Sequence, residues 1–318
     1  MVAFPTETVY GLGANGLDEL ACQKIYEAKG RPSDNPLILH ISNIDMLYNL
    51  VDEVSEPSKK LINSCWPGPL TIIFKKSKII PDIVSAGLDT VAIRFPSHPI
   101  AKSLIESANV PIAAPSANIS GRPSPTNAND VFFDMEGKIP LILDGGSSDI
   151  GIESTVIDLS EEIPTILRPG YFTIEMISKI LPTVRFDDAL IKEGITPKSP
   201  GQKYTHYSPK ALMKVYVGEG ALDKLLSEAF LLKTQGKKVG ILAFEGDLEK
   251  LSGYYSISLG KKDDLSYMSH IFYSALRKMD KENIDIILAI GVSDNNLGKS
   301  IMNRMRKSAS GNVYSTEG

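Results

Sequence analysis

The sequence Ile-Ala-Ala-Pro-Ser-Ala-Asn-Ile-Ser-Gly-Arg occupies residues 112–122 and combines the two features on which the fold prediction rests. Its first three residues form a short apolar run, which predicts a buried strand at Ile112–Ala114. The residues that follow are polar or turn-forming and begin without a spacer. Because ligands of α/β sheets bind where strands end, this junction predicts a site as well as a strand.

Similar apolar runs recur through the first part of the chain. We predict further strands, each rich in Val, Ile or Leu, at Val2–Phe4, Leu37–Ile41, Leu70–Lys75, Val91–Phe95, Leu141–Leu143, Thr155–Asp158 and Thr165–Leu167. Helices are predicted at Asp18–Lys29, Pro99–Ser107 and Thr173–Leu181. Many strands with few helices between them favour an α/β or α+β sheet over a helical bundle or an all-β sandwich.

The composition changes near residue 210. All 20 prolines lie at or before Pro209. Residues 1–210 hold 19 basic and 25 acidic side chains, a net charge of −6, whereas residues 211–318 hold 15 and 13, a net charge of +2. We therefore predict one domain at 1–186, a linker at 187–210 and a second domain at 211–318. Since the linker is long and contains aromatic residues, it is expected to cover a binding site rather than act as a spacer.

The last part of the chain alternates between predicted strands and helices. The strands are Met213–Val217, Val239–Phe244, Tyr255–Ser258 and Ile284–Ile290, and the helices are Ala221–Gln235, Leu265–Lys281 and Asn296–Ala309. Such alternation is typical of a small parallel sheet with helices on its faces.

Composition and charge exclude several classes of protein. The chain is 42% hydrophobic and 23% charged with a net charge of −4, which argues against disorder and against binding nucleic acid through bulk positive charge. Two cysteines and four scattered histidines make a disulfide framework or a zinc site improbable on counting grounds. No secretory signal is visible and no apolar run approaches the roughly 20 residues that span a bilayer, so a cytoplasmic location is expected.

Two glycine motifs suggest nucleotide-binding loops but fit them poorly. Gly11–Gly16 matches G-x-G-x-x-G, yet a polar segment separates it from the preceding strand, so we expect a glycine-rich turn. Gly298-Lys299-Ser300 opens a predicted helix, but Ser293 stands where a phosphate-binding loop has its first glycine.

Polar clusters border the predicted elements of the first domain. They are Pro5–Tyr10, Lys29–Pro36, Pro115–Arg122, Gly151–Thr155 and Leu167–Gly170. One Lys and several Arg side chains, together with Ser and Asn donors, suit an anion with several oxygens, such as a polyphosphate or an adenylate.

Individual residues also have structural interpretations. Lys29 or Arg31 alone would be a solvated cation at a helix C-terminus, and Ser116 or Asn118 alone a turn residue. His40 lies in an apolar strand and would be a core histidine.

Arg94 is different, because a charge flanked by apolar strand residues needs a partner. We expect that partner to be a carboxylate.

Taken together, these motifs resemble the YrdC family. The resemblance is carried, in order, by Phe4–Gly13, Ala28–His40, Trp66–Thr71, Ala113–Gly121, Glu153–Val156 and Leu167–Gly170. The later sequence P-G-Q-K-Y-T-H-Y-S-P at 200–209 is similar to that of the longer, two-domain form. The resemblance implies a YrdC-like twisted mixed sheet with flanking helices, followed by a smaller Rossmann-like parallel α/β domain.

The resemblance also implies a reaction. Members of this family are threonylcarbamoyl-AMP synthases, which convert L-threonine, bicarbonate or CO2, and ATP with Mg2+ into L-threonylcarbamoyl-AMP and pyrophosphate. The product passes to a separate transferase complex that makes threonylcarbamoyladenosine in tRNA, next to the anticodon. No membrane partner and no strong direct binding of nucleic acid are expected.

The family's residues map onto this sequence by motif. Its catalytic Lys-x-Arg and Ser-x-Asn signature falls on Lys29, Arg31, Ser116 and Asn118. The implied ATP-binding residues are Arg31, Asn35, Thr90, Ser116, Asn118, Ser124, Arg168, Tyr204 and His206. The implied threonine-binding residues are Thr8, His40, Arg94, Ala114 and Ser154. The family usually has a helical segment before the first strand, whereas this sequence starts at that strand.

Two alternatives remain at this point. A double-stranded-RNA-binding or ribosome-maturation module would require a dense basic surface, which the net charge of −6 over residues 1–210 disfavours. A carbamoyl-adenylate enzyme of hydrogenase maturation would require zinc-binding cysteines, of which too few are present. The second domain lacks a polar cluster, which favours a regulatory or docking role.

Overall fold

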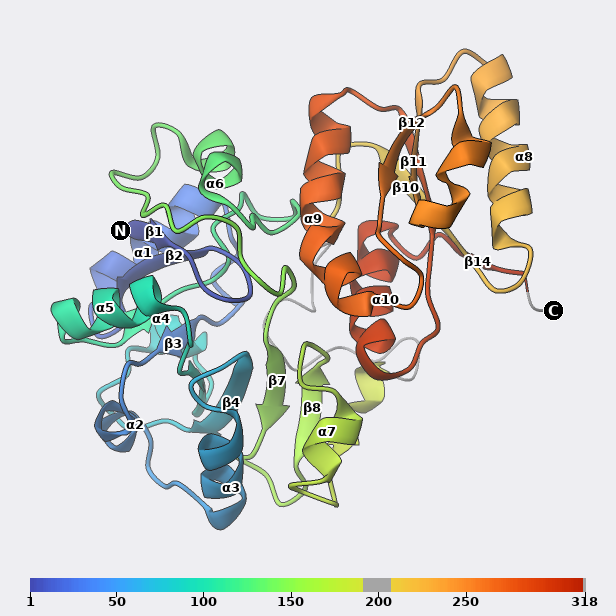
Figure 1. Ribbon diagram of the computed structural model, residues 1–318. Helices are drawn as coiled ribbons and strands as arrows, with labels where there is room; N and C mark the ends of the chain where they lie inside the picture. Colours follow the sequence, from blue (N-terminus) through green and yellow to red (C-terminus); the bar gives the residue numbers. More distant parts are fainter. Residues whose placement is uncertain (191–206, 317–318) are drawn as a thin grey trace. The chain divides into compact units, whose positions relative to one another are not determined.

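The computed structural model describes residues 1–190 and 207–316. These residues divide into two compact units. The first contains residues 1–120 and 124–190, and the second contains 207–316 together with the tripeptide Gly121–Pro123. Each unit has its own sheet (Figure 1).

The first unit is built on a nine-stranded mixed sheet in the order β1-β2-β6-β3-β5-β4-β7-β8-β9. Its strands are β1 (Val2–Phe4), β2 (Gly11–Asn15), β3 (Ile38–His40), β4 (Leu70–Lys75), β5 (Thr90–Arg94), β6 (Ile112–Ala113), β7 (Thr155–Asp158), β8 (Thr165–Arg168) and β9 (Arg185–Phe186). Strand pairs β3–β5, β4–β7 and β8–β9 are parallel and the others antiparallel. The predicted mixed sheet is therefore confirmed.

Seven helices belong to the described part of this unit. They are α1 (Glu19–Lys29), α2 (Ile44–Leu50), α3 (Glu56–Cys65), α4 (Asp82–Ser85), α5 (Pro99–Ala108), α6 (Ala128–Met135) and α7 (Ile174–Ser178), followed by the 3-10 turn η1 (Asp188–Leu190). Helix α1 begins as predicted, because the Asp18 side chain accepts a hydrogen bond from the Ala21 amide. It ends at Gly30, whose φ of 60° is in the left-handed region that glycine adopts readily.

Two predictions for this unit are wrong. Gly11–Asn15, expected to be a turn, forms β2, because Gly11 and Gly13 leave room for the Phe4 ring of β1; a Cβ atom on Gly13 would lie 2.8 Å from that ring. Leu141–Leu143, expected to be a strand, makes only an isolated bridge between Ile142 and Ala3. Helices α2, α3, α4 and α6 were not predicted.

The second unit contains a five-stranded, entirely parallel sheet in the order β12-β11-β13-β10-β14. Its elements are β10 (Leu212–Val217), α8 (Ala221–Thr234), β11 (Val239–Ala243), η2 (Glu245–Leu251), β12 (Tyr255–Ser258), α9 (Leu265–Lys281), β13 (Ile286–Ile290), α10 (Asn296–Ser308) and β14 (Val313–Ser315). The predicted strand–helix alternation is confirmed, with β14 as an additional edge strand.

The crossovers of this sheet place its helices on both faces. The connection through α8 runs in one direction along the strand order, whereas those through α9 and α10 run in the other. Since such crossovers are right-handed, α8 covers one face and α9 and α10 cover the other (Figure 1). No helix among the described residues has the length and apolar character needed to cross a membrane.

Candidate active site

The first unit has a main core on one face of its sheet and a polar site on the other. Ile72 of β4 and Ile93 of β5 belong to the large core cluster. Their neighbours Ile73 and Ala92 point to the opposite face, where they belong to a separate, small apolar cluster. Because side chains alternate along a strand, Thr90, Ala92 and Arg94 of β5 all lie on this second face.

Strand register extends this face sideways from Arg94. Arg94 is paired with Thr71 on β4 and with His40 on β3. Directly paired residues project to the same side of a sheet, so these three side chains form a row across three strands. His40 and Arg94 were both among the implied threonine-binding residues, and neither strand alone would show that they are neighbours.

The segment after β1 supplies partners for Arg94. Arg94 Nη2 forms an ion pair with Glu7 Oε1 at 2.8 Å, and Arg94 Nη1 donates to Thr8 Oγ1 at 2.8 Å. Thr6 Oγ1 accepts from the Thr8 and Val9 amides and fixes the bend of this segment. The expected carboxylate partner of Arg94 is therefore Glu7.

His40 is held neutral by its surroundings. Burial and the nearby Arg94 guanidinium lower the pKa of His40 to about 3. Its Nδ1 lies 3.2 Å from the Ile38 carbonyl oxygen and 3.3 Å from that of Ile112. A neutral imidazole next to a guanidinium can donate or accept a hydrogen bond without adding a second positive charge.

Ser154 and Arg168 continue the polar row on the β7–β8 side. Arg168 donates from Nε to the Ser154 carbonyl at 3.0 Å and from Nη2 to Ser154 Oγ at 3.1 Å. Ser154 Oγ is also 2.7 Å from Thr71 Oγ1. Arg168, implied to bind ATP, and Ser154, implied to bind threonine, are thus in direct contact.

The Lys-x-Arg and Ser-x-Asn signatures meet although they are far apart in sequence. Lys29 Nζ donates to the carbonyl oxygens of Ser116 and Asn118, each at 2.5 Å. Ser116 Oγ donates to Asn118 Oδ1 at 2.5 Å. Lys29 is 2% exposed, so the interpretation of this residue as a solvated helix end is wrong.

Arg31 shapes the start of the segment that leads to β3. It donates from Nε to the Asn35 carbonyl and from Nη2 to the Pro36 carbonyl, both at 3.1 Å. Both bonds use main-chain oxygens, so they set the conformation of 31–36 whatever the side chain of Asn35 contacts. Arg31 and Asn35, both implied nucleotide ligands, are therefore neighbours.

Ser124 lies between the two groups of residues. It is fully buried and donates to Glu153 Oε1 at 2.6 Å. Glu153 immediately precedes Ser154, so this bond connects the segment after the Ser-x-Asn turn to the residues that contact Arg168. Glu153 was not predicted as a site residue; its position beside Ser154 in the Glu-Ser-Thr motif was the available signal.

Main-chain hydrogen bonds join the loops that carry these side chains. The Ala117 amide donates to the Tyr10 carbonyl at 2.8 Å, and the Gly151 amide donates to the Thr8 carbonyl at 3.0 Å. The polar clusters after β1, after β6 and before β7 are therefore parts of one structure. Their joint occurrence in the sequence predicted this better than any single residue did.

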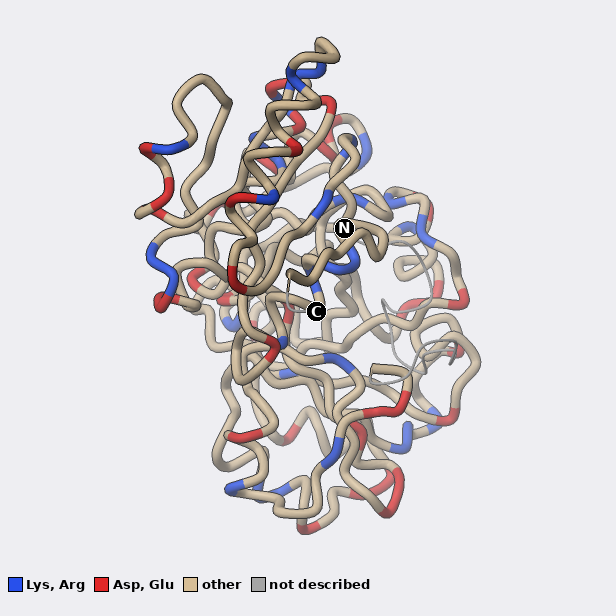
Figure 2. Tube along the Cα trace, turned by 90° about the vertical axis from the view of Figure 1, so that its right-hand side faces the viewer, with Lys and Arg blue, Asp and Glu red and all other residues tan. Residues whose placement is uncertain are grey.

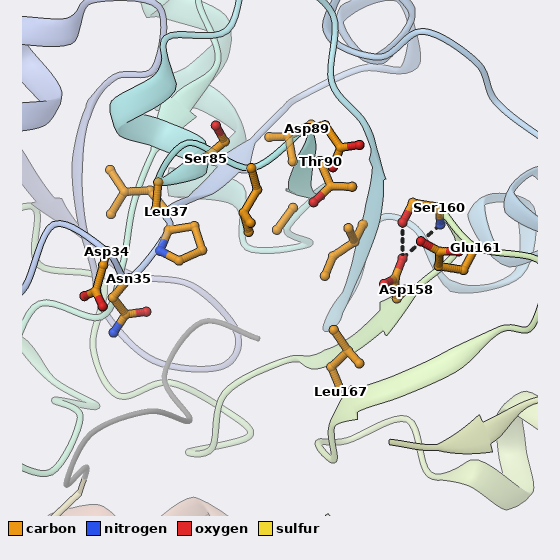
Figure 3. Close-up of a pocket in the computed structure, with 16 residues that line it drawn as sticks. Asp34, Asn35, Leu37, Ser85, Asp89, Thr90, Asp158, Ser160, Glu161 and Leu167 are labelled. Carbon is orange, nitrogen blue, oxygen red and sulfur yellow. Dashed lines mark hydrogen bonds between the residues drawn. The ribbon is translucent and has the colours of Figure 1, made fainter. Parts of the chain in front are cut away.

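A cavity of about 360 Å3 opens on the same sheet face (Figure 3). Its apolar wall includes Ile73, Ala92 and Leu167, and its rim includes Asn35 and Thr90. Four acidic side chains also line it: Asp34, Asp89, Asp158 and Glu161. Asp158 is oriented by Ser160, which donates to it from both its amide and its hydroxyl.

The structure brings together most of the implied site residues. Thr90 and Arg94 stand at opposite ends of β5 on one face, and Ala114 continues β6 with its amide bonded to the Ile38 carbonyl. Tyr204, His206 and residues 191–206 of the predicted linker lie outside the described residues. Among the described residues, no three His, Cys, Asp or Glu side chains are grouped so that they could hold a metal ion.

This arrangement defines an α/β protein with a row of polar and charged side chains on one face of a mixed sheet. The family model Sua5_yciO_yrdC, described as "Telomere recombination", matches residues 1–170. A second model, described as "Threonylcarbamoyl-AMP synthase, C-terminal domain", matches residues 172–310. The chain belongs to the Sua5/YciO/YrdC family, as its motifs predicted.

Several relatives align with nearly the whole chain, across both matched regions. A protein from Pyrococcus abyssi named threonylcarbamoyl-AMP synthase is 48% identical over 314 residues, covering 97% of this chain and 90% of the relative. A protein of the same name from Bacillus subtilis is 45% identical, with coverages of 98% and 90%. The crystal structure of P. abyssi Sua5 complexed with L-threonine superposes with a TM-score of 0.92 at 45% identity, covering 99% of this chain and 92% of that one.

Proposed function

We propose that this protein synthesises L-threonylcarbamoyl-AMP from L-threonine, CO2 or bicarbonate, and ATP. The observation that carries the proposal is the single sheet face on which Thr90, Ala92 and Arg94 alternate along β5. Thr90 borders the cavity, whereas Arg94 lies in the polar row with His40. At about 3.4 Å per residue, the two ends of this line are roughly 14 Å apart, which suits an adenylate joined to an amino acid.

The proposed reaction has two steps. The amine nitrogen of threonine forms a bond to the carbon of CO2 and releases protons, which gives a carbamate. A carbamate oxygen then attacks the α-phosphorus of ATP, the bond to the bridging oxygen breaks, and pyrophosphate leaves. Such phosphorus chemistry depends mainly on positioning and on stabilising negative charge.

Residues around the Ser-x-Asn turn would carry that stabilisation. Lys29 brings a buried positive charge to the turn, and its bonds to two carbonyls hold the Ser116 and Asn118 side chains in place. Arg31 would add charge on the phosphate side. Mg2+ would enter with ATP, with phosphate and water oxygens as its main ligands.

The cavity beside Thr90 would take the nucleoside. Its apolar wall offers a surface for a base, and its acidic rim offers acceptors for ribose hydroxyls or an exocyclic amino group. The same acids would repel phosphates, which favours a nucleotide orientation with its phosphates directed away from them.

A substrate screen tests the proposal. The protein is mixed with MgATP, bicarbonate and each amino acid in turn, and pyrophosphate is measured. We expect threonine to give release well above that of every other amino acid, with threonylcarbamoyl-AMP detected by mass spectrometry. Equal release without an amino acid would contradict the proposal. The RNA-binding alternative predicts tight, steeply salt-dependent RNA binding in the absence of ATP. The described chain does not favour it, because its acidic and basic residues are interspersed (Figure 2).

A further inference from the structure

A buried ion pair in the site leaves hydrogen-bonding atoms unused. The side chains of Glu7 and Arg94 are 7% and 5% exposed. Glu7 Oε1 is engaged by Arg94 Nη2 at 2.8 Å, but among the described residues Glu7 Oε2 receives no hydrogen bond and Arg94 Nε donates none. Buried polar atoms are nearly always satisfied, so a cluster of such atoms at one position points to a missing ligand.

The unused atoms have complementary chemistry. Carboxylate oxygens accept hydrogen bonds and carry negative charge, whereas the guanidinium Nε–H donates and carries positive charge. An amino acid zwitterion presents the matching pair, an ammonium group that donates and a carboxylate that accepts. The same place also holds the Thr8 hydroxyl, which is 2.8 Å from Arg94 Nη1.

We propose that Glu7 binds the ammonium group of the amino acid substrate. This inference rests on the proposed function, since it assigns an additional residue to the threonine end of that site. Glu7 would thereby fix the nitrogen atom that goes on to react with CO2. The pairing of Glu7 with Arg94 keeps the empty site close to neutral, so a zwitterion adds no net charge when it binds.

If Glu7 served only to neutralise Arg94, its second carboxylate oxygen would need no free hydrogen-bonding capacity. Such a role would be satisfied by a carboxylate whose oxygens were hydrogen-bonded by the protein, as Glu153 Oε1 is by Ser124. Glu7 contacts Arg94 through Oε1, and its main-chain carbonyl accepts from the Ile150 amide at 2.8 Å. Within the described residues its Oε2 has no donor, so this oxygen is left for a donor on the ligand.

The test compares L-threonine with (R)-3-hydroxybutanoate, which keeps the carboxylate and hydroxyl but lacks the amine. Binding of each is measured by calorimetry on the full chain. Glu7→Gln should weaken threonine binding at least tenfold and leave 3-hydroxybutanoate and ATP within twofold. Glu27→Gln, an exposed carboxylate on α1, is the matched control and should change none of these affinities. Equal weakening of both small ligands, or of neither, would overturn the assignment of Glu7.

Two further measurements distinguish a failure of the proposed function from a failure of the Glu7 assignment. If wild-type protein neither binds threonine nor releases pyrophosphate with it, the proposed function itself is wrong. If Glu7→Gln does not fold, Glu7→Asp decides, because it keeps the charge and moves it by one methylene. That variant should bind threonine more weakly yet still prefer it to 3-hydroxybutanoate, and loss of affinity for both ligands alike would show a purely structural role.

Discussion

Lys29 Nζ donates a hydrogen bond to the main-chain carbonyl of Asn118, 89 residues further along the chain. The lysine closes α1, and the asparagine stands in the turn after β6. The Ser120 amide donates back to the Lys29 carbonyl at 2.9 Å, so the helix end and the turn are joined in both directions. The cation is thus part of the turn that it is expected to serve.

Lys29→Met should abolish most of the proposed synthesis. The change keeps the apolar stem but removes the charge and both bonds to the turn, and loss of a single such donor typically costs 100- to 1,000-fold in rate. We expect pyrophosphate release in the presence of threonine to fall by about 100-fold or more. Lys24→Met, an exposed lysine on the same helix, should keep wild-type rates. A Lys29→Met rate within threefold of wild type would remove Lys29 from the catalytic set.

Arg31→Ala should separate activity from folding. Arg31 is partly exposed, and its hydrogen bonds from Nε and Nη2 go to the main-chain carbonyls of Asn35 and Pro36 rather than into the core, so its loss should shift the melting temperature by a few degrees at most. The KM for ATP should rise and synthesis should largely be lost, because a cation near the phosphates is missing. Arg306→Ala, which removes an exposed ion pair with Asp294 in the second unit, is the control. Unchanged threonine-dependent pyrophosphate release would show that Arg31 has no such role.

The sequence predicted the bounds of individual strands and helices well. It indicated which distant segments lie together only through the family resemblance. β1, β4, β7, β12 and α9 have the predicted bounds, because their apolar periodicity and caps are local properties. β2 was not predicted, since glycine has low strand propensity and only the Phe4 ring of the neighbouring strand explains it.

The side-chain partners within the site were harder to predict from the sequence. An apolar strand with a single arginine predicted a carboxylate partner for Arg94, but nothing in the sequence identified Glu7, 87 residues away. The burial of Lys29 was missed for the same reason. Lys29 bonds to the main-chain carbonyls of Ser116 and Asn118, and because every residue has such a carbonyl, the sequence does not mark these two as partners. Side chains that bond to main chain leave no compositional signal, and such bonds build much of this site.

The two cysteines should be unreactive in the folded protein. Burial raises the pKa of Cys22 to about 12 and that of Cys65 to about 11, so almost no thiolate is present at neutral pH. Iodoacetamide at pH 7.5 should label neither thiol in the native state over an hour and both in guanidinium chloride. Rapid labelling of either native thiol would show that its helix opens readily.

His40 should make the protein sensitive to acid. The pKa of His40 is lowered to about 3 by burial and by Arg94, whereas in the unfolded chain it should be near 6.5. Between these values the unfolded state binds a proton that the folded state does not, so stability falls as the pH falls below about 6.5. From pH 7 to pH 5 this one group should remove about 2 kcal/mol of unfolding free energy. Urea unfolding at both pH values, compared with His40→Gln, measures the contribution. The variant should lose about 2 kcal/mol less than wild type on acidification, and parallel losses in the two proteins would mean that His40 is not held neutral.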